Sequence, residues 1–150
     1  MNGLHLGLIG AGNMATAILD GVVAKGLFPP ENMMISNPHT DKLEHPRSLG
    51  VRVTCDNAAV AQAADLIILA VKPQKFEEVL AGIHTCCAGK CVVSIAAGIS
   101  TGWIRARLPG ALVVRAVPNT PMQLGLGATA VAQAPDVPDE LFQTVCDIFS

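Results

Sequence analysis

A glycine-rich segment near the N-terminus has the residue types and the spacing that hold a dinucleotide. Residues 10–15 read Gly-Ala-Gly-Asn-Met-Ala and match the pattern G-x-G-x-x-G/A. In this pattern the first glycine makes the turn, the second lets the backbone approach a pyrophosphate, and the third small residue lets helix and strand pack closely. An apolar segment precedes the turn and a helical pattern follows it, so we expect the diphosphate at a helix N-terminus. The alternative is a glycine turn with a purely structural role.

The residues after the second apolar segment indicate which nicotinamide cofactor binds. An NAD site usually places Asp or Glu there, on the ribose 2′-hydroxyl. The stretch 35–40 holds no carboxylate before Asp41, so a 2′-phosphate would meet no repulsion. Side chains that could donate to this phosphate are Ser36, Asn37, His39, Thr40, Lys42 and Arg47. The sequence therefore predicts NADP(H), with NAD(H) also possible, whereas a plain Asn-Pro turn would leave the choice open.

Polar or turn-forming residues follow four further apolar segments. They are Asp56 with Asn57, Lys72 with Pro73, Ala97 with Gly98, and residues 118–121. Each pair could by itself be only turn chemistry. In a doubly wound sheet, however, ligands bind outside the carboxyl ends of the strands. Together these residues are expected to line one edge of such a sheet.

Short apolar segments predict the strands that must position these residues. They cover residues 4–9, 33–36, 51–54, 66–71, 92–96 and 112–117, with a further candidate at 125–132. Segments rich in Val, Ile and Leu without alternation are typical of a parallel sheet covered on both faces. Helical spacing follows the glycine turn up to Gly26 and recurs over 74–83. The expected fold is α/β, a Rossmann-type doubly wound, mainly parallel sheet.

Composition and charge exclude several classes of protein. A hydrophobic fraction of 51% excludes disorder. A net charge of −2 gives no field that would attract nucleic acid or an anionic membrane. The longest apolar stretches fall short of the roughly 18 residues that a membrane span needs, and the N-terminus lacks the basic region of a secretory signal. We therefore expect a cytoplasmic protein whose partner is a small molecule or another protein.

Five cysteines are an odd number without even spacing, which favours free thiols in a reducing compartment. His84, Cys86, Cys87 and Cys91 lie close together in the sequence. They lack the C-x-x-C pairs that are typical of structural zinc sites. We therefore predict no metal site.

An amphipathic helix is expected in the last residues of the sequence. Asp136, Val137 and Pro138 indicate its N-terminal cap. Its apolar residues are Leu141, Phe142, Val145, Ile148 and Phe149, with no Gly, Asn or Pro to end the helix. We expect this apolar face to be exposed and the single domain of residues 1–150 to be truncated within this helix.

Four segments taken together resemble the N-terminal half of the pyrroline-5-carboxylate reductase family. They are residues 9–14, 70–73, 94–98 and 117–121, and Asn57 falls where the family places a cofactor-binding Asn. One such segment is common among Rossmann enzymes, but four in this order at these separations are specific. The resemblance implies NADPH-dependent reduction of 1-pyrroline-5-carboxylate to L-proline, the last step of proline biosynthesis.

The resemblance also implies that the cofactor and the substrate are bound mainly by two different domains. In the family a helical C-terminal domain, absent from these residues, forms the homo-oligomer and holds the substrate, so no catalytic residue is predicted here. The chain is expected to supply the cofactor domain and to be nearly inactive alone. The expected cofactor-binding residues are Ile9, Gly10, Ala11, Gly12, Asn13, Met14, Asn37, Asn57, Ala70, Val71, Lys72, Pro73, Ile95, Ala96, Ala97 and Asn119.

Two other functions are compatible with the sequence. One is a noncatalytic NAD(P) sensor whose exposed last helix docks on a partner. The other is a different Rossmann reductase, similar to the hydroxyacid dehydrogenases. Within the main hypothesis, Asn119 could face the nicotinamide or the substrate, or could only cap a turn between two prolines.

Overall fold

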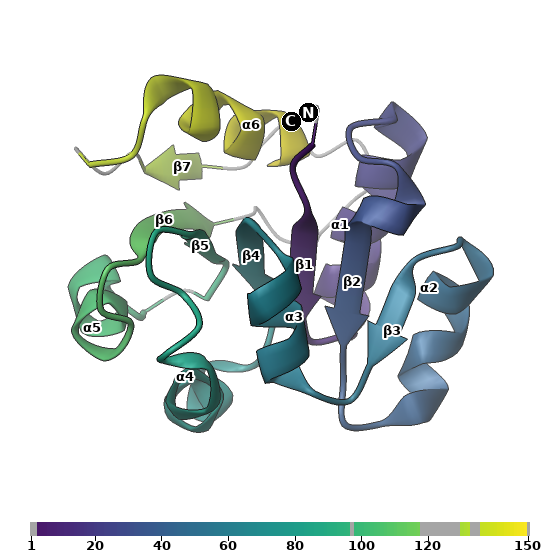
Figure 1. Cartoon of the computed structure of the whole chain (residues 1–150), viewed down its shortest axis with the longest axis horizontal. Helices are drawn as coiled ribbons and strands as arrows, with labels where there is room; N and C mark the ends of the chain where they lie inside the picture. The colour runs from purple at the N-terminus through teal and green to yellow at the C-terminus, as the bar shows by residue number, and fades with distance from the viewer. Residues whose placement is uncertain (1–2, 97, 118–129, 133–135, 150) are drawn as a thin grey trace.

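A seven-stranded sheet forms the centre of the molecule, which we describe from a computed structural model over residues 3–96, 98–117, 130–132 and 136–149 (Figure 1). The strands are β1 (Leu6–Ile9), β2 (Met33–Ser36), β3 (Arg52–Thr54), β4 (Leu66–Leu69), β5 (Cys91–Ser94), β6 (Leu112–Val117) and β7 (Ala130–Ala132). Their order is β3-β2-β1-β4-β5-β6-β7. All neighbouring pairs are parallel except β6 and β7, which are antiparallel. This is the doubly wound order of dinucleotide-binding folds with one added edge strand, so the predicted fold class is confirmed.

Six α-helices and three short 3-10 helices accompany the strands in the described residues, and the last of them, α6, follows β7. The α-helices are α1 (Asn13–Lys25), α2 (Glu44–Ser48), α3 (Asn57–Ala63), α4 (Phe76–Ile83), α5 (Thr101–Arg107) and α6 (Asp139–Phe149). The 3-10 helices are η1 (Pro30–Asn32), η2 (Thr40–Leu43) and η3 (Pro73–Lys75). As predicted, α1 ends at Gly26, which has a φ of 67°. None of the helices in the described ranges is long and apolar enough to cross a membrane.

The sheet carries an apolar layer on each face. One layer packs against α1 and α6, and the other against α3, α4 and α5; in Figure 1, α3 lies in front of the sheet and α1 behind it. The two layers explain why the sequence of strand β4 is apolar at every position. Leu66 and Ile68 belong to the first layer, Ile67 and Leu69 belong to the second, and all four are buried. Because helices cover both faces, neither set of alternating side chains meets water.

Four strands, β1, β3, β4 and β5, are shorter than predicted. Strand β1 begins at Leu6 instead of residue 4, and β3 begins at Arg52 instead of residue 51. Strand β4 ends at Leu69, although the N–H of Ala70 still donates to the carbonyl of Ile9 at 2.9 Å. The chain then leaves the sheet at Pro73, the first residue of η3, which has no N–H to donate to a neighbouring strand. Strand β5 covers Cys91–Ser94 instead of residues 92–96. Of the seventh predicted strand, residues 125–129 lie outside the described residues.

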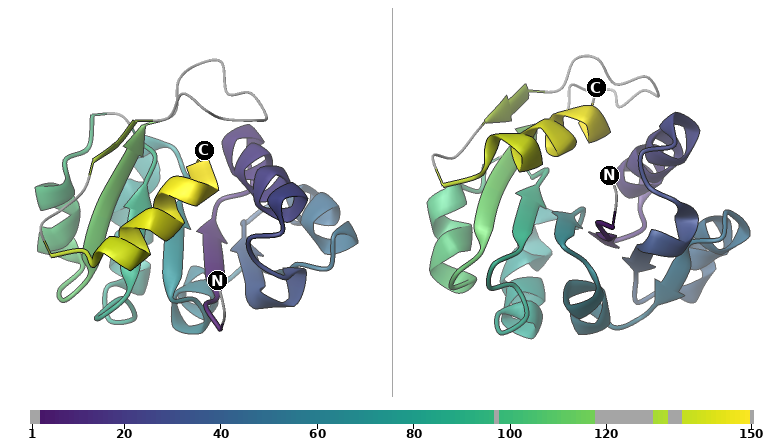
Figure 2. Two further views of the ribbon diagram at one scale, coloured as in Figure 1. Left: turned by 90° about the horizontal axis from the view of Figure 1, so that it is seen from above. Right: turned by 45° about the horizontal axis from the view of Figure 1, so that its top comes forward.

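The prediction of an exposed apolar face on the last helix was wrong. Val145, Ile148 and Phe149 of α6 are buried in the same layer as α1, and Leu141 and Phe142 are partly buried against it. Figure 2 shows α6 and α1 on one face of the sheet. The Nζ of Lys25 in α1 donates to the carbonyl of Asp147 in α6 at 3.2 Å. The apolar stripe of α6 therefore covers the sheet, and the sensor hypothesis loses the exposed helix that motivated it.

Candidate dinucleotide-binding site

The glycine turn is fixed between the ends of β2 and β4. The N–H of Gly10 donates to the carbonyl of Ser36 at 2.8 Å. Gly10 has a φ of 106°, and a Cβ at this position would lie 2.6 Å from the carbonyl oxygen of Ala70. Only glycine fits both this backbone conformation and this close approach. The first glycine of the motif is therefore required by the fold itself.

The second glycine leaves open space at the start of α1. Gly12 is the N-cap residue, with an ordinary φ of −78°, and no side chain of the described residues caps this end of the helix. A Cβ on Gly12 would meet no heavy atom within 4 Å. The first N–H groups of α1 and the positive end of its dipole face this space. An anionic group such as a diphosphate fits there, in contact with the backbone at Gly12, Asn13 and Met14.

Asn37 joins the glycine turn to the end of β2. Its Oδ1 accepts a hydrogen bond from the N–H of Ala11 at 3.3 Å, and its Nδ2 donates to the carbonyl of His39 at 3.2 Å. The backbone N–H of Asn37 donates to the carbonyl of Thr54 in β3 at 3.2 Å. These bonds hold the half-buried Asn37 at the junction of β1, β2 and β3. The residues predicted for the diphosphate and for the adenosine end are thus brought together.

Ser36 and Asn57 form a second contact at the same edge. Ser36 is fully buried, and its hydroxyl donates to Oδ1 of Asn57, the first residue of α3, at 2.7 Å. The helix is capped by Asp56, which accepts from the N–H of Ala58 at 3.0 Å. The prediction that Ser36 donates to a 2′-phosphate was wrong, because its hydroxyl is buried and bonded within the protein.

Four of the other predicted phosphate donors are exposed, whereas Asn37 is half-buried and its Nδ2 donates to His39. His39 precedes η2, Thr40 begins it, Lys42 lies within it, and Arg47 lies on α2. Arg47 pairs with Glu44 at 3.4 Å, and both side chains are largely exposed. Such a surface pair contributes little, so Arg47 can exchange it for a ligand at small cost. These four residues lie in the segment that follows β2, where a 2′-phosphate is expected.

The ends of β4 and β5 offer mainly backbone groups. Ile9 and Ala96 are buried, and Ala70, Val71 and Ile95 are partly buried, while Lys72 and Pro73 are exposed. The N–H of Ala96 donates to the hydroxyl of Ser94 at 3.3 Å. A ligand at this edge would therefore meet peptide groups and the side chain of Lys72. Ala97 and Asn119, the two remaining predicted site residues, lie outside the described residues.

Gly7 is a positioning residue that we did not predict. A Cβ on Gly7 would lie 2.5 Å from Cγ1 of Val60 and 2.8 Å from Cβ of Ala64. Glycine at this position of β1 lets α3 approach the sheet and so sets the place of Asn57. A glycine inside an apolar strand indicates such a close approach, and that signal was present in the sequence.

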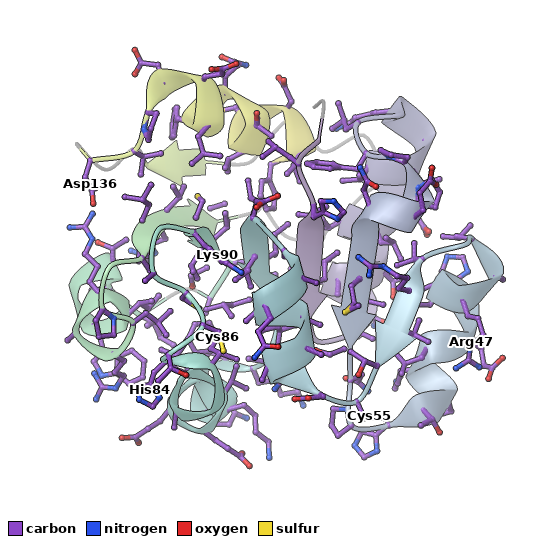
Figure 3. All side chains as sticks on the ribbon, in the orientation of Figure 1. Arg47, Cys55, His84, Cys86, Lys90 and Asp136 are labelled. Carbon is purple, nitrogen blue, oxygen red and sulfur yellow. The ribbon has the colours of Figure 1, made fainter. Side chains whose placement is uncertain are left out.

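The cysteines other than Cys55 lie on other elements: Cys86 and Cys87 follow α4, Cys91 begins β5, and Cys146 lies on α6. All five are free thiols, and in Figure 3 Cys86 and His84 lie near α4, whereas Cys55 lies to their right, in the connection between β3 and α3. The ring of His84 bonds to the carbonyl of Ala81 at 3.0 Å. No group of three or more His, Cys, Asp or Glu side chains within the described ranges could hold a metal ion.

Strand order and glycine turn together define a domain of the Rossmann class. Residues 5–98 match the family described as NADP oxidoreductase, coenzyme F420-dependent, and the chain belongs to this family. Among curated proteins, it is 38% identical to a pyrroline-5-carboxylate reductase of Synechocystis sp. over 92% of the chain and 52% of that protein. It is 40% identical to the enzyme of Vibrio alginolyticus over 84% of the chain and 47% of that protein.

Solved structures give the same result. A pyrroline-5-carboxylate reductase from Coxiella burnetii matches with a TM-score of 0.92 at 33% identity, over 99% of this chain and 56% of that one. The Plasmodium falciparum pyrroline carboxylate reductase, solved with NADP bound, matches with a TM-score of 0.86 at 26% identity, over 99% and 55%. The resemblance seen in four sequence segments is confirmed. The chain spans about half the length of the curated relatives it matches.

Proposed function

We propose that this chain is the NADP(H)-binding domain of a pyrroline-5-carboxylate reductase, which reduces 1-pyrroline-5-carboxylate to L-proline. The observation that carries the proposal is the open space at Gly12, where a Cβ would meet nothing within 4 Å at the uncapped start of α1. The similarity to reductases with this name, one of them solved with NADP bound, supports it. Bound NADPH supplies the hydride that reduces the imine carbon.

The chain's own residues bind and orient the cofactor in this proposal. Backbone N–H groups from Gly12 to Met14 hold the diphosphate. Asn37 keeps the turn in shape, and Asn57 donates to the adenosine end. The exposed His39, Thr40, Lys42 and Arg47 surround the 2′-phosphate, where a positive charge favours NADP(H) over NAD(H).

Backbone groups at the ends of β4 and β5 border the ribose and the nicotinamide and exclude water from them. These residues are Ala70 to Pro73, and Ile95 with Ala96 and Ala97. Ile9 contributes its backbone at the start of the turn, since its side chain is buried. Asn119 remains a predicted contact on the nicotinamide or substrate side.

We further propose that the substrate contacts, the catalytic groups and the homo-oligomer interface belong to the part of the relatives' length that these residues do not match. The support is the coverage of the relatives, which is about half. A reducing compartment such as the cytoplasm suits the five free thiols.

A substitution at Gly12 tests the cofactor site directly. Gly12→Ala places a methyl group in the space proposed for the diphosphate, and we expect NADPH binding to weaken about 10-fold or more, equivalent to about 1.4 kcal/mol. The melting temperature should stay close to that of the unsubstituted chain, because Gly12 has an ordinary φ and no neighbour to displace. Fluorescence titration with NADPH and a thermal melt measure the two quantities.

Gly21→Ala is the matched control for this experiment. Gly21 also lies on α1, and a Cβ added there would likewise have no heavy atom within 4 Å, but it follows Gly12 by about 2.5 helical turns. It should leave NADPH binding unchanged. Failure of the unsubstituted chain to bind NADPH, or equal binding by the Gly12→Ala chain, would contradict the proposed function.

A further inference from the structure

We infer that Ser36 is a positioning residue for cofactor binding, whose buried hydroxyl holds the amide of Asn57 in the orientation that donates to the adenosine half of the dinucleotide. This inference rests on the proposed function, and it adds a residue that would not touch the cofactor. The sequence predicts that Ser36 contacts a phosphate, but the structure gives its hydroxyl a different task.

The burial of Ser36 makes its hydrogen bond specific. The residue ends β2 with none of its surface exposed, and a buried hydroxyl requires a partner. That partner is Oδ1 of Asn57 at 2.7 Å. Since an amide oxygen only accepts, the hydroxyl of Ser36 is the donor.

The bond decides which end of the Asn57 amide is available. With Oδ1 facing Ser36, the Nδ2 group must point away from the end of β2 because the two atoms diverge from the same carbon. Asn57 is half-buried, and among the described residues its Nδ2 makes no further hydrogen bond. Two N–H donors are therefore held ready at the start of α3. Ribose hydroxyls, phosphate oxygens and adenine nitrogens are the acceptors that an adenosine nucleotide offers to them.

The backbone ties this pair to the glycine turn. The carbonyl of Ser36 accepts from the N–H of Gly10 at 2.8 Å, so the residue that orients Asn57 also anchors the turn. The close packing of α3 on Gly7 fixes the start of the helix relative to β1. Ser36 thus orients one donor group before the cofactor arrives, which lowers the entropy lost by Asn57 on binding.

A double-mutant cycle tests this role. Ser36→Ala should weaken the binding of NADPH, and equally that of 2′,5′-ADP, about 3- to 10-fold, the range expected for one hydrogen bond. Asn57→Ala should weaken both ligands at least as much. In the Asn57→Ala background, adding Ser36→Ala should change affinity by less than about 2-fold, since its effect passes through Asn57. Titrations of the full chain with both ligands, alongside thermal melts, measure the cycle.

Ser94 provides the matched control. It is likewise fully buried at the last position of a strand, β5, but its hydroxyl accepts from the N–H of Ala96 and does not contact Asn57. If Ser94→Ala weakens NADPH binding, the double substitution Ser94→Ala with Asn57→Ala should weaken it by the product of the two single fold-changes, as expected for independent residues. If the double substitution Ser36→Ala with Asn57→Ala also weakens NADPH binding by the product of its two single fold-changes, the positioning role of Ser36 is overturned. The cofactor site itself would not be contradicted by that result.

A measurement without cofactor separates this inference from the proposed function. The side-chain amide of Asn57 gives a pair of resonances in a ¹⁵N–¹H correlation spectrum, assigned by their loss in Asn57→Ala. Ser36→Ala should shift this pair, and Ser94→Ala should not. An unshifted pair overturns the positioning role whether or not NADPH binds, whereas absent NADPH binding with a shifted pair overturns the proposed function alone.

Discussion

Asn37 belongs both to the fold and to the proposed site. Its amide accepts from Ala11 and donates to His39, so both ends of the side chain are engaged within the protein. In the sequence, the absence of a carboxylate at this position predicts a preference for NADP(H). The structure adds that the neutral amide is needed for the turn itself. A carboxylate at this position could still accept from Ala11 but could not donate to the carbonyl of His39.

Replacing Asn37 by Asp should therefore change cofactor preference. We expect Asn37→Asp to weaken NADPH at least about 10-fold more than NADH, a difference of about 1.4 kcal/mol. The reason is repulsion between the new carboxylate and the 2′-phosphate, which NADH lacks. Dissociation constants of the two cofactors, measured at one ionic strength, check this result.

Asn37→Ala distinguishes the effect of the new negative charge from the effect of the lost hydrogen bonds. It removes both side-chain hydrogen bonds of Asn37 without adding a negative charge, so it should weaken NADPH and NADH by similar factors. An equal loss of both cofactors in the Asn37→Asp chain would show that the 2′-phosphate lies elsewhere.

At the scale of elements, α3 is held at both of its ends. Asp56 caps its first turn, and Lys90 donates from Nζ to the carbonyls of Ala61 and of Gln62, the latter at 3.0 Å. Lys90 lies beside α3 in Figure 3. A cation is favoured at a helix C-terminus because it meets the last free carbonyls and the negative end of the dipole. The position of α3 is thus set by a cap directly before Asn57, the residue it presents, and by the contacts of Lys90 at the opposite end of the helix.

The closeness of α3 to β1 can be tested at Gly7. Gly7→Ala forces the new methyl against Val60 and Ala64, so α3 must move outward or the side chains must strain. We expect a loss of about 1 to 3 kcal/mol in the free energy of unfolding, as for other overpacked sites. Urea denaturation measures this loss, and weaker NADPH binding should accompany it as Asn57 shifts.

Gly82→Ala serves as the comparison for Gly7→Ala. Gly82 lies in α4 with nothing within 4 Å of an added Cβ, so alanine there should stabilise the chain by about 0.5 to 1 kcal/mol. Should Gly7→Ala prove as harmless as Gly82→Ala, the tight contact between α3 and β1 would be refuted.

Particular elements show what the sequence could predict. The glycine turn, the unbroken apolar strands and the buried face of α4 follow from local patterns, because each depends on residues within one element and its turn. The bond from Ser36 to Asn57 joins residues 21 positions apart, and no spacing rule indicates it. The apolar face of α6 was predicted, but its partner was not, since periodicity shows that a face is buried without showing against what.

At the scale of the whole molecule, buried thiols lie in both apolar layers. Cys87 is in the layer of α4, and Cys91 is in the layer of α1 and α6. Burial raises the pKa of Cys87 from 9.0 to about 11 and that of Cys91 to about 12. Because the folded state disfavours the thiolates, both groups stabilise the fold fully below pH 9.0, and this contribution is lost as the pH rises toward 11 and 12.

The stability of the chain should therefore fall as the pH rises above about 9. We expect the chain with both Cys87→Ala and Cys91→Ala to lose stability less steeply over this range, because two of the groups that must ionise are gone. Urea denaturation from about pH 8 to about pH 10.5 gives the slopes. Cys55→Ser, which removes an exposed thiol, should keep the slope of the unsubstituted chain, and parallel slopes in all three chains would refute the effect.

The packing of α6 on α1 affects how the chain can fold while it is being synthesised on the ribosome. Strand β1 and α1 are synthesised early, yet the layer that buries them is completed by Val145, Ile148 and Phe149. The bond from Lys25 to Asp147 spans 122 positions. Until α6 (Asp139–Phe149) emerges, the nascent chain carries an uncovered apolar face, so we expect chaperones to bind it before these residues are synthesised.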